Sequence, residues 1–409
     1  MRILVIVPHY WPDGGTAAPL YTGLCEELVC RSHQVTALTA VPHYPSGQVP
    51  KDYRGKLRTQ AVENGVNVIR VGLPSMRRSD LRARLLQFIS YQVGAALAGL
   101  NLEYVVCLAT TAALQVWLPY ALLSVLRRRG AVYSVADIYP DVGVKLGVFR
   151  NKVVINLVKS LESFCLNHAA QVRVLSKSFR PTLLSRGVPE SKMSVIYDWI
   201  DTNTIKPLPR YNNFAIENKL VNRFVVLYAG NIGYLQGLEH VVEAARLLKD
   251  SGDIEFVFAG DGSARESLIE KSDRLGLSNT RFLPYQPFKQ MPEVLATADI
   301  SLVTLLKGSG FGALPSKSYA IFASGRPLLA SVDEGCELWD LVKTSEAGLC
   351  VPPENPHRLA EAIHRLKQDD SARERLGRNG RLWAERYHSP QSAAQKFEEL
   401  LLAATNSRG

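Results

Sequence analysis

The sequence predicts an α/β fold with two doubly wound, Rossmann-like domains that face a central cleft. Short apolar runs of strand length alternate with amphipathic segments of helix length along the whole chain. That alternation is typical of parallel sheets with helices on both faces. The chain has 409 residues, more than one ordinary hydrophobic core uses. A Pro- and Asn-rich stretch at 206–213 has the composition of a linker between the two halves.

The order of the predicted elements gives each half its own sheet. The predicted strands of the first half are 2–7, 34–39, 66–71, 104–109, 132–135, 172–175 and 193–196. Those of the second half are 224–229, 255–259, 280–283, 300–305, 328–331 and 348–351. Helical patterns separate most of the strands, for example at 17–31, 237–250, 264–275 and 291–297.

These elements divide the chain into three parts. Residues 1–205 form an N-terminal Rossmann-like domain, and residues 206–389 form a second Rossmann-like domain. Residues 390–409 contain an amphipathic helix with no strand after it. In enzymes with two Rossmann-like domains such a helix commonly crosses back to the first domain, and we expect the same here.

The net charge of +10 lies entirely in the N-terminal half. Residues 1–205 carry 23 Lys and Arg against 13 Asp and Glu, whereas residues 206–409 carry 25 of each kind. Such a basic domain predicts an anionic partner, either a membrane surface, a nucleic acid or a phosphorylated substrate, unless the charge is only a solvated face. No nucleic acid is expected, because the basic residues are not interleaved with aromatic residues in a known binding module.

Two segments of the N-terminal half bear on membrane association. Residues 85–126 hold a single charged residue, and 105–126 is long enough to span a bilayer. We favour a strand at 104–109, a loop and a buried helix at 112–126, because several polar residues interrupt the run. Residues 76–89 mix arginines with large apolar side chains, which suits a helix that lies on an anionic membrane surface.

The stretch 308–327 carries the strongest signal for ligand binding. Three glycines in its first five residues allow its backbone to approach a ligand closely. Pro315 and Ser316 then open a short helix with Lys317 in its first turn. Free N–H groups and a positive charge therefore lie where an anion would bind. We predict that Gly310, Pro315, Ser316 and Lys317 belong to a phosphate site.

Other glycine turns also follow predicted strands. Gly15 lies in the turn after the first strand, and Asn231 and Gly233 lie in the turn after the first strand of the second half. A third such turn covers 260–262. Several of these turns in order within one domain are much stronger evidence than one alone. Tyr285 follows the next strand, where a nucleotide base could stack on it or bond to the backbone.

Two side chains at strand ends are candidates for catalysis. Asp137 follows the strand at 132–135, and a carboxylate at that edge of a sheet is a typical site group. The nearby Asp141 is as readily a cap or turn residue. His43 follows the second strand and is either an acid–base group or an ordinary loop residue. The six cysteines have no zinc-site spacing, so they indicate structural thiols.

The order of these motifs resembles glycosyltransferase family 4 over essentially the full chain, and especially its colanic acid and O-antigen biosynthesis branch. The residues that carry the resemblance are Tyr44-Pro45, Asp137 with Pro140-Asp141, Gly230-Asn231 with Gly233, Pro315-Ser316-Lys317 and Gly325-Arg326-Pro327. The resemblance implies the GT-B fold, no cofactor, no metal, and transfer of a sugar from a nucleotide diphosphate sugar with retention of configuration. It places the donor on the second domain and the acceptor on the first.

The chain departs from the family pattern at one pair of positions. Many members carry two glutamates eight positions apart around the glycine loop, and the second glutamate bonds the ribose. Here those positions are Gly312 and Ala320. The ribose contact must come from elsewhere, and Asp333, Glu334 and Glu337 are the nearest substitutes.

The resemblance thus predicts an enzyme that is cytoplasmic and peripheral on the inner face of the plasma membrane. It would transfer a sugar from an NDP-sugar, with UDP as the expected nucleotide. The acceptor would be a polyprenyl-diphosphate-linked glycan in exopolysaccharide, lipopolysaccharide or O-antigen biosynthesis, and the basic domain would face anionic lipid.

In this prediction Lys317 and the amides of Gly233, Ser316 and Gly15 hold the diphosphate. Asp137, with His43 as an alternate, faces the reacting centre. Two other functions stay open. One is a UDP-sugar epimerase of the same fold, which needs no lipid acceptor. The other is a noncatalytic partner of a glycosyltransferase, which the missing glutamate pair would explain.

Overall fold

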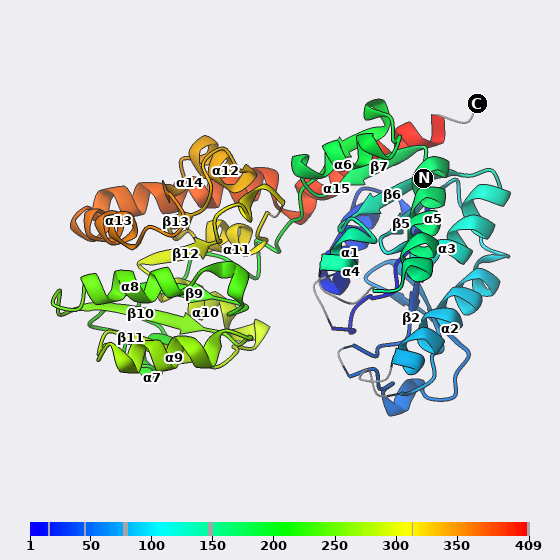
Figure 1. The fold of residues 1–409 in the computed structure, drawn as a ribbon. Coiled ribbons are helices and arrows are strands. Elements are labelled where there is room, and N and C mark those ends of the chain that lie inside the picture. Colours follow the sequence, from blue (N-terminus) through cyan, green and yellow to red (C-terminus); the bar gives the residue numbers. More distant parts are fainter. Residues whose placement is uncertain (15–16, 45, 77–80, 146–149, 313, 407–409) are drawn as a thin grey trace. The chain divides into compact units, whose positions relative to one another are not determined.

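The computed structural model describes residues 1–409 except 15–16, 45, 77–80, 146–149, 313 and 407–409 (Figure 1). The chain divides into two compact units, residues 1–198 with 390–409 and residues 199–389. The division lies after Asp198 rather than after residue 205. The N–H of Ile200 bonds to the carbonyl of His388 at 2.8 Å, and Arg381 donates to the carbonyls of Thr202 and Ile205. These bonds tie the segment after Asp198 to the second unit.

The first unit contains an eight-stranded sheet in the order β3-β4-β2-β1-β5-β6-β7-β8. Its strands are β1 (Arg2–Ile6), β2 (Gln34–Ala40), β3 (Arg58–Glu63), β4 (Val66–Val71), β5 (Val106–Thr110), β6 (Gly130–Val135), β7 (Gln171–Val174) and β8 (Met193–Val195). The apolar runs correctly predicted all of these except β3. Every neighbouring pair other than β3 and β4 is parallel.

The edge strand β3 is an antiparallel addition to the predicted parallel sheet. It pairs antiparallel with β4, with Arg58 opposite Val71 and Glu63 opposite Val66. Most of its residues are exposed, so it lacks the continuous apolar run that marks a buried parallel strand. A polar edge strand of this kind also discourages pairing with strands of other molecules.

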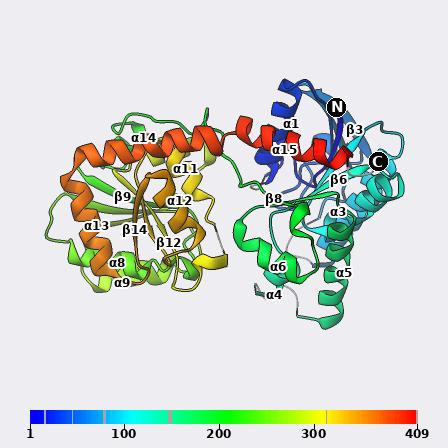
Figure 2. The ribbon, with the colours of Figure 1, turned by 90° about the horizontal axis from the view of Figure 1, so that it is seen from above.

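Helices cover both faces of this sheet. They are α1 (Ala17–Cys30), α2 (Leu81–Gly99), α3 (Ala113–Tyr120), α4 (Asp141–Lys145), α5 (Lys152–His168), α6 (Arg180–Ser185) and α15 (Pro390–Asn406). On one face α3 packs between α2 and α5 (Figure 1). On the other face α15 lies beside α1 (Figure 2). Helix α15 buries Ala393, Phe397, Leu401 and Ala404, the spacing of an amphipathic helix. It fits closely, since a Cβ on Gly130 would lie 2.1 Å from the Ala404 carbonyl oxygen.

The uncharged segment at 85–126 folds as predicted, with a strand followed by a buried helix. Strand β5 leads into α3, and residues 121–126 continue it as a π-helix. Val116, Tyr120 and Leu123 are fully buried against the sheet. Within the described residues, every helix is too short or too polar to cross a bilayer.

The second unit contains a six-stranded parallel sheet in the order β11-β10-β9-β12-β13-β14. Its strands are β9 (Phe224–Ala229), β10 (Ile254–Ala259), β11 (Thr280–Leu283), β12 (Ile300–Thr304), β13 (Leu328–Ser331) and β14 (Gly348–Val351). Its helices are α7 (Asn213–Glu217), α8 (Glu239–Leu247), α9 (Arg265–Arg274), α10 (Met291–Ala296), α11 (Lys317–Ala323), α12 (Glu337–Ser345), α13 (Pro356–Gln368) and α14 (Asp370–Tyr387). All six strands lie close to their predicted bounds.

In each sheet the first strand of the unit lies in the interior and the strand order reverses beside it. The reversal occurs between β1 and β5 in the first unit and between β9 and β12 in the second. Open α/β sheets bind ligands outside the carboxyl ends of their strands at such a reversal. The loops that leave these strands are therefore the places to look for function.

Candidate functional site

In the second unit, the predicted phosphate residues gather at the strand-order reversal. Asn231 and Gly233 leave β9, and the glycine loop at 308–312 leaves β12 and leads to Lys317 in α11. The two loops are joined, because the N–H of Leu306 bonds to the carbonyl of Leu235 at 2.9 Å. The fold thus brings together glycines and a lysine that are about 80 residues apart in the sequence.

The turns after β9 and β10 interlock through backbone contacts that only glycine allows. A Cβ on Gly260 would lie 1.9 Å from the carbonyl oxygen of Gly230. Gly262 has a φ of +154°, and a Cβ there would lie 2.4 Å from the carbonyl oxygen of Ile232. The N–H of Ile232 in turn bonds to the carbonyl of Asp261 at 2.8 Å. These contacts hold the backbone of the β9 turn in one conformation.

Lys317 is a largely buried cation beside these turns. Its Nζ donates to the Tyr228 hydroxyl at 2.7 Å and lies 4.0 Å from the centre of the Tyr228 ring. A Cβ on Gly230 would lie 3.3 Å from the same Nζ. Burial lowers the pKa of Lys317 to about 8. Among the described residues, no carboxylate lies within ion-pair distance of Lys317.

Asp333 fixes the glycine loop rather than facing outward. Its carboxylate accepts hydrogen bonds from the N–H of Gly308 at 2.9 Å and of Gly310 at 3.1 Å, and the side chain is buried. A Cβ on Gly310 would lie 3.0 Å from that carboxylate, which explains the glycine. Because the carboxylate of Asp333 is already bonded to the backbone of the loop, Asp333 is a poor ribose ligand. Glu337, partly buried as the first residue of α12, stays the predicted ribose contact.

The other residues predicted to bind the nucleotide sugar lie at different distances from Lys317. Pro315 and Ser316 directly precede α11, and their carbonyls accept the N–H groups of Ser318 and Tyr319. Tyr285 follows the edge strand β11, two strands away from β9, and its ring is 71% exposed. Gly15 lies outside the described residues.

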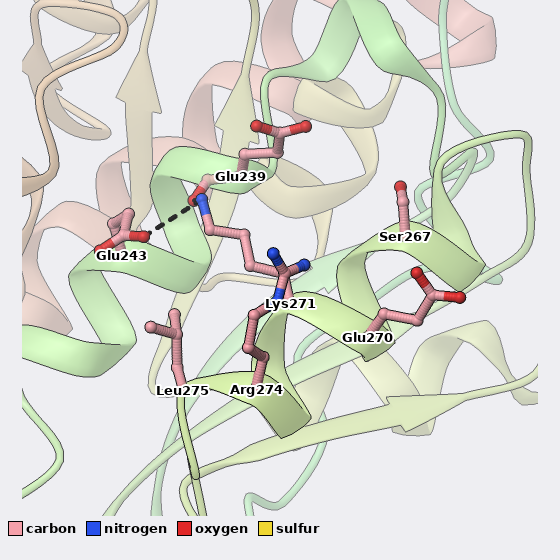
Figure 3. Close-up of a pocket in the computed structure, with 7 residues that line it drawn as sticks. All are labelled: Glu239, Glu243, Ser267, Glu270, Lys271, Arg274 and Leu275. Carbon is pink, nitrogen blue, oxygen red and sulfur yellow. Dashed lines mark hydrogen bonds and ion pairs between the residues drawn. The ribbon is translucent and has the colours of Figure 1, made fainter.

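A surface groove between α8 and α9 is a separate feature of this unit (Figure 3). Its volume is about 450 Å³, and it is lined by Glu239, Glu243, Ser267, Glu270, Lys271, Arg274 and Leu275. Lys271 pairs with Glu243 at 3.1 Å and donates to the carbonyl of Glu239. Charges of both signs line the groove and partly neutralise each other, and none of the predicted site residues lies in it.

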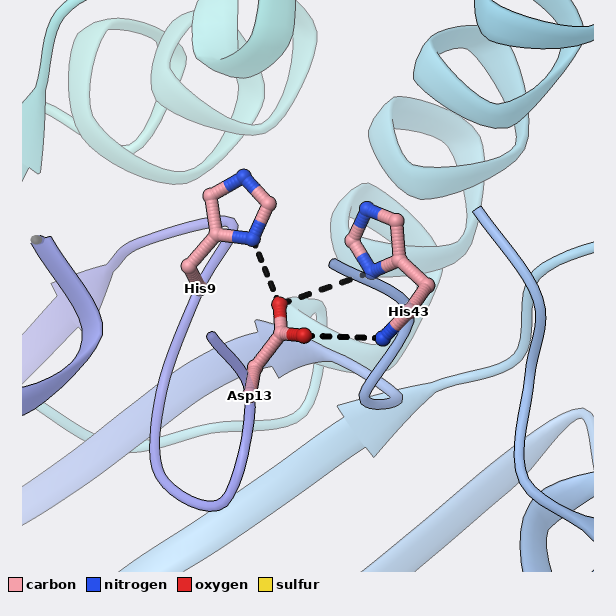
Figure 4. A group of neighbouring side chains, drawn as sticks. All are labelled: His9, Asp13 and His43. Atoms are coloured by element: carbon pink, nitrogen blue, oxygen red, sulfur yellow. Dashed lines mark hydrogen bonds and ion pairs between the residues drawn. The ribbon is translucent and has the colours of Figure 1, made fainter. Parts of the chain in front are cut away.

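In the first unit, the loops after β1 and β2 bring His43 against two residues that sequence analysis missed (Figure 4). One oxygen of Asp13 lies 2.5 Å from Nδ1 of His9 and 3.6 Å from Nδ1 of His43. The two imidazole rings stack with centroids 5.0 Å apart. The only sequence signal was a His and an Asp four residues apart after the first strand, and nothing local connects them to His43.

Asp13 organises both of these loops. Its second oxygen accepts the N–H groups of His43 at 2.8 Å and Tyr44 at 2.7 Å, and the residue is only 3% exposed. Burial by itself would raise the pKa of Asp13, but the hydrogen bond from His9 and the contacts with His43 outweigh it and lower the pKa. A small cavity lined by Pro8, Phe88, Tyr91 and both histidines adjoins the cluster.

Asp137 lies at the carboxyl end of β6, as predicted from its position after that strand. Its side chain keeps substantial contact with solvent. Partial burial, and then the negative charge of Asp198, raise its pKa. Strands β1 and β5 lie between β2, which precedes the loop of His43, and β6.

Asp141 has a structural role. Its carboxylate accepts a hydrogen bond at 2.7 Å from Arg186, which also donates to the carbonyl of Tyr139. The pair joins the loop after β6 to the end of α6. This agrees with the interpretation of Asp141 as a turn residue.

Comparison with known proteins identifies both halves of the chain. Residues 14–199 match the family model described as "Glycosyl transferase 4-like domain". Residues 210–383 match the model described as "Glycosyl transferases group 1". The two models together cover most of the chain.

One full-length relative is WcaI of Escherichia coli (strain K12), whose name assigns it to colanic acid biosynthesis as a glycosyl transferase. It is 28% identical over 89% of this chain and 91% of its own length.

Two solved structures share the fold over nearly all of both chains. Sucrose-phosphate synthase from Thermosynechococcus elongatus has a TM-score of 0.70 at 17% identity and covers 98% of each chain. HepE from Anabaena, in complex with UDP, has a TM-score of 0.69 at 16% identity, over 98% of this chain and all of its own. The predicted α/β fold of the GT-B type and the predicted family are thus confirmed. With two Rossmann-like units, glycine turns at the strand-order reversal and both family domains in sequence, this chain belongs to glycosyltransferase family 4 and is a glycosyltransferase.

Proposed function

We propose that the protein is a retaining glycosyltransferase that transfers a sugar from a UDP-sugar to a polyprenyl-diphosphate-linked glycan during polysaccharide biosynthesis. One observation carries the proposal: the largely buried charge of Lys317 lies beside rigid glycine turns at the strand-order reversal of the second unit. The name of WcaI, with its reference to colanic acid, supports the polysaccharide. The bound UDP of HepE supports the nucleotide.

In this proposal the leaving diphosphate is stabilised without a metal or another cofactor. Negative charge develops on the diphosphate as the glycosidic bond to it breaks, and preorganised donors lower the energy of that state. Lys317 supplies a full charge, and the amides of Gly233 and Ser316 supply hydrogen bonds. The exposed ring of Tyr285 is a stacking surface for the base.

The first unit would then bind the acceptor. Asp137 is an exposed carboxylate at the carboxyl end of β6, and we assign it to the reacting centre or to an acceptor hydroxyl. Its raised pKa makes it a better proton acceptor than an ordinary aspartate near neutral pH.

A lipid-linked acceptor requires that the enzyme reach a membrane surface. The first unit has a surface with which it could bind a membrane. Apolar side chains are exposed along α2 and α5, which flank α3 on one side of the sheet (Figure 1). They are Leu85, Leu86, Ile89, Val93 and Leu97 on α2 and Val153, Val154 and Leu157 on α5. The exposed Lys152 and Lys159 flank the α5 group. Apolar and basic side chains together favour peripheral binding to an anionic membrane, and we place the enzyme on the cytoplasmic face.

The direct test is calorimetric titration of UDP and GDP into the wild-type protein, Lys317→Ala and the exposed control Lys289→Ala. UDP should bind the wild type and Lys289→Ala alike. Loss of a hydrogen bond to a charged group should weaken UDP binding to Lys317→Ala by about 10- to 100-fold. Turnover should fall by roughly 100- to 1000-fold, while the unfolding midpoint changes little.

Other outcomes would redirect the proposal. A preference for GDP would keep the mechanism and change the donor. If neither nucleotide binds a folded protein, the noncatalytic partner becomes the better description. Sugar rearrangement without any acceptor would indicate the epimerase.

A further inference from the structure

We propose that His9, Asp13 and His43 form a binding site for a divalent transition metal of the Zn²⁺ class. Among the described residues, this is the group of histidine and carboxylate side chains whose ligand atoms converge, all within 4.8 Å of one another. The site lies in the first unit and is independent of the proposed UDP-sugar chemistry of Lys317.

The chemistry of the donors fits such a metal. Two imidazole nitrogens and one carboxylate oxygen are ligands that Zn²⁺, Co²⁺ and Ni²⁺ accept, whereas Mg²⁺ and Ca²⁺ prefer oxygen alone. Ligands bonded to one Zn²⁺ are separated by roughly 3–4 Å. The Asp13 oxygen lies 2.5 Å from Nδ1 of His9 and 3.6 Å from Nδ1 of His43, so small side-chain shifts reach that spacing.

The support around the ligands is already in place. One oxygen of Asp13 accepts two backbone N–H groups, from His43 and Tyr44, which leaves the other oxygen directed toward the histidines (Figure 4). Hydrogen bonds to a ligating carboxylate are characteristic of metal sites and fix the ligand before the metal arrives. The loops themselves start from β1 and β2, which are hydrogen-bonded neighbours.

Two existing contacts must change when the metal binds. The hydrogen on Nδ1 of His9, which bonds to the Asp13 carboxylate, must move to the other ring nitrogen of His9. Nδ1 of His43 lies 3.0 Å from the carbonyl oxygen of Val41. Because a carbonyl only accepts, Nδ1 carries the hydrogen in the metal-free form. Metal binding would move that hydrogen to the other ring nitrogen, so the imidazole stays neutral and no net proton is lost. The carbonyl of Val41 then becomes an oxygen within reach of the metal.

Three protein ligands leave a coordination position for a further group, as in zinc sites that bind water or substrate. The adjoining cavity is lined by Pro8, Tyr91 and Gln87 among others and has room for about one water-sized group, with a volume of about 10 Å³. A water or a single hydroxyl oxygen fits that space.

The test uses the full chain without an affinity tag that contains histidine. Zn²⁺ and Co²⁺ are titrated by calorimetry, and Co²⁺ binding is followed by its visible absorption, which distinguishes nitrogen and oxygen ligands from thiolates. The variants are His9→Gln, His43→Gln and Asp13→Asn, of which the last retains an oxygen for the two N–H groups. His33→Gln is the matched control, because His33 also pairs with a carboxylate, Glu398, at 2.7 Å.

We expect one Co²⁺ per chain, bound without thiolate absorption. Each of the three variants should weaken binding by at least the 10- to 100-fold that even a supporting residue contributes. His33→Gln should bind like the wild type. Circular dichroism establishes that each variant is folded.

The proposal is overturned if the wild type shows no saturable binding, if the cluster variants bind as tightly as the wild type, or if His33→Gln loses binding equally. The three residues would then be a hydrogen-bonded cluster that orders two loops. UDP titration of the Lys317→Ala variant is a separate readout, because it tests the proposed nucleotide site and not the metal site.

Discussion

Burial disfavours the charged form of Glu162 in the first unit and of Lys317 in the second, and the two side chains differ in the partners that surround them. In the first unit, burial raises the pKa of Glu162 to about 7. Its carboxyl group is 2% exposed and bonds to the Tyr133 hydroxyl at 3.0 Å and the Ala113 N–H at 3.2 Å. In the second unit, burial lowers the pKa of Lys317 to about 8, and its hydrogen-bond partner is the Tyr228 hydroxyl.

The comparison shows that a shifted pKa alone does not mark a functional site. Glu162 is enclosed by α3, α5 and β6 and is satisfied within the core, so we interpret it as structural. Lys317 borders glycine turns at the strand-order reversal, where a ligand can approach, and no described carboxylate balances its charge. The two side chains are distinguished by their position in the fold and by whether partners within the protein satisfy them, rather than by the size of the pKa shift.

The largest expected effect is on the free energy of unfolding, and it tests the structural role of Glu162. Between pH 4.5 and about 7 the native state retains the Glu162 proton and the unfolded state does not, so stability falls as pH rises through that window. Glu162→Gln should remove this loss, on the order of 3 kcal/mol. Urea unfolding at pH 5 and pH 8 measures it, with the exposed Glu217→Gln as control. Equal pH dependence in wild type and Glu162→Gln would contradict the interpretation.

The next effect concerns the rigidity of the turns around Lys317. Gly260→Ala places a Cβ 1.9 Å from the Gly230 carbonyl oxygen. We expect about 1–3 kcal/mol of lost stability and weaker UDP binding, because the β9 turn must move. Gly23→Ala in α1 is the control, since nothing lies within 4 Å of its Cβ. It should leave UDP binding unchanged and add about 0.5–1 kcal/mol of stability. Normal UDP affinity in Gly260→Ala would show that the turn is not part of the site.

A smaller effect tests whether the charge of Lys317 serves ligand binding. UDP prefers the protonated lysine, so its affinity should fall as pH rises through about 8, by at most about tenfold per pH unit. Lys317→Ala should lack this fall. Calorimetric titrations between pH 6.5 and pH 9.5 measure it. A fall of the same size in Lys317→Ala would assign the dependence to another group.

The smallest expected effect contrasts the outer surfaces of the two units. Ile89→Ser combined with Leu97→Ser removes two exposed apolar side chains from α2. We expect roughly tenfold weaker sedimentation with vesicles rich in phosphatidylglycerol. Leu382→Ser, which changes an exposed side chain of α14 in the second unit, should have no effect. Equal vesicle binding by all three proteins would remove α2 from the membrane surface.

Much of the fold was predictable because its signals are local. Buried parallel strands such as β9 and β12 are short apolar runs that can be recognised without knowledge of their neighbours. Gly325 follows the last turn of α11 with a φ of +69°, a conformation that favours glycine, so a glycine after a helical pattern marks the end of a helix. Strand β3 was missed for the same reason, because an exposed edge strand has no apolar run.

The candidate site was predictable only where its residues share a loop or a motif. The sequence by itself determined that glycine turns and Lys317 follow strands of a doubly wound sheet, since strand ends and helix starts are encoded locally. Tertiary structure decided that Asp333 is bound to the amides of the glycine loop, that Lys317 is buried beside Tyr228, and that His9, Asp13 and His43 meet. These contacts join residues up to 89 positions apart. Their partners are set by strand order and packing, which no local pattern specifies.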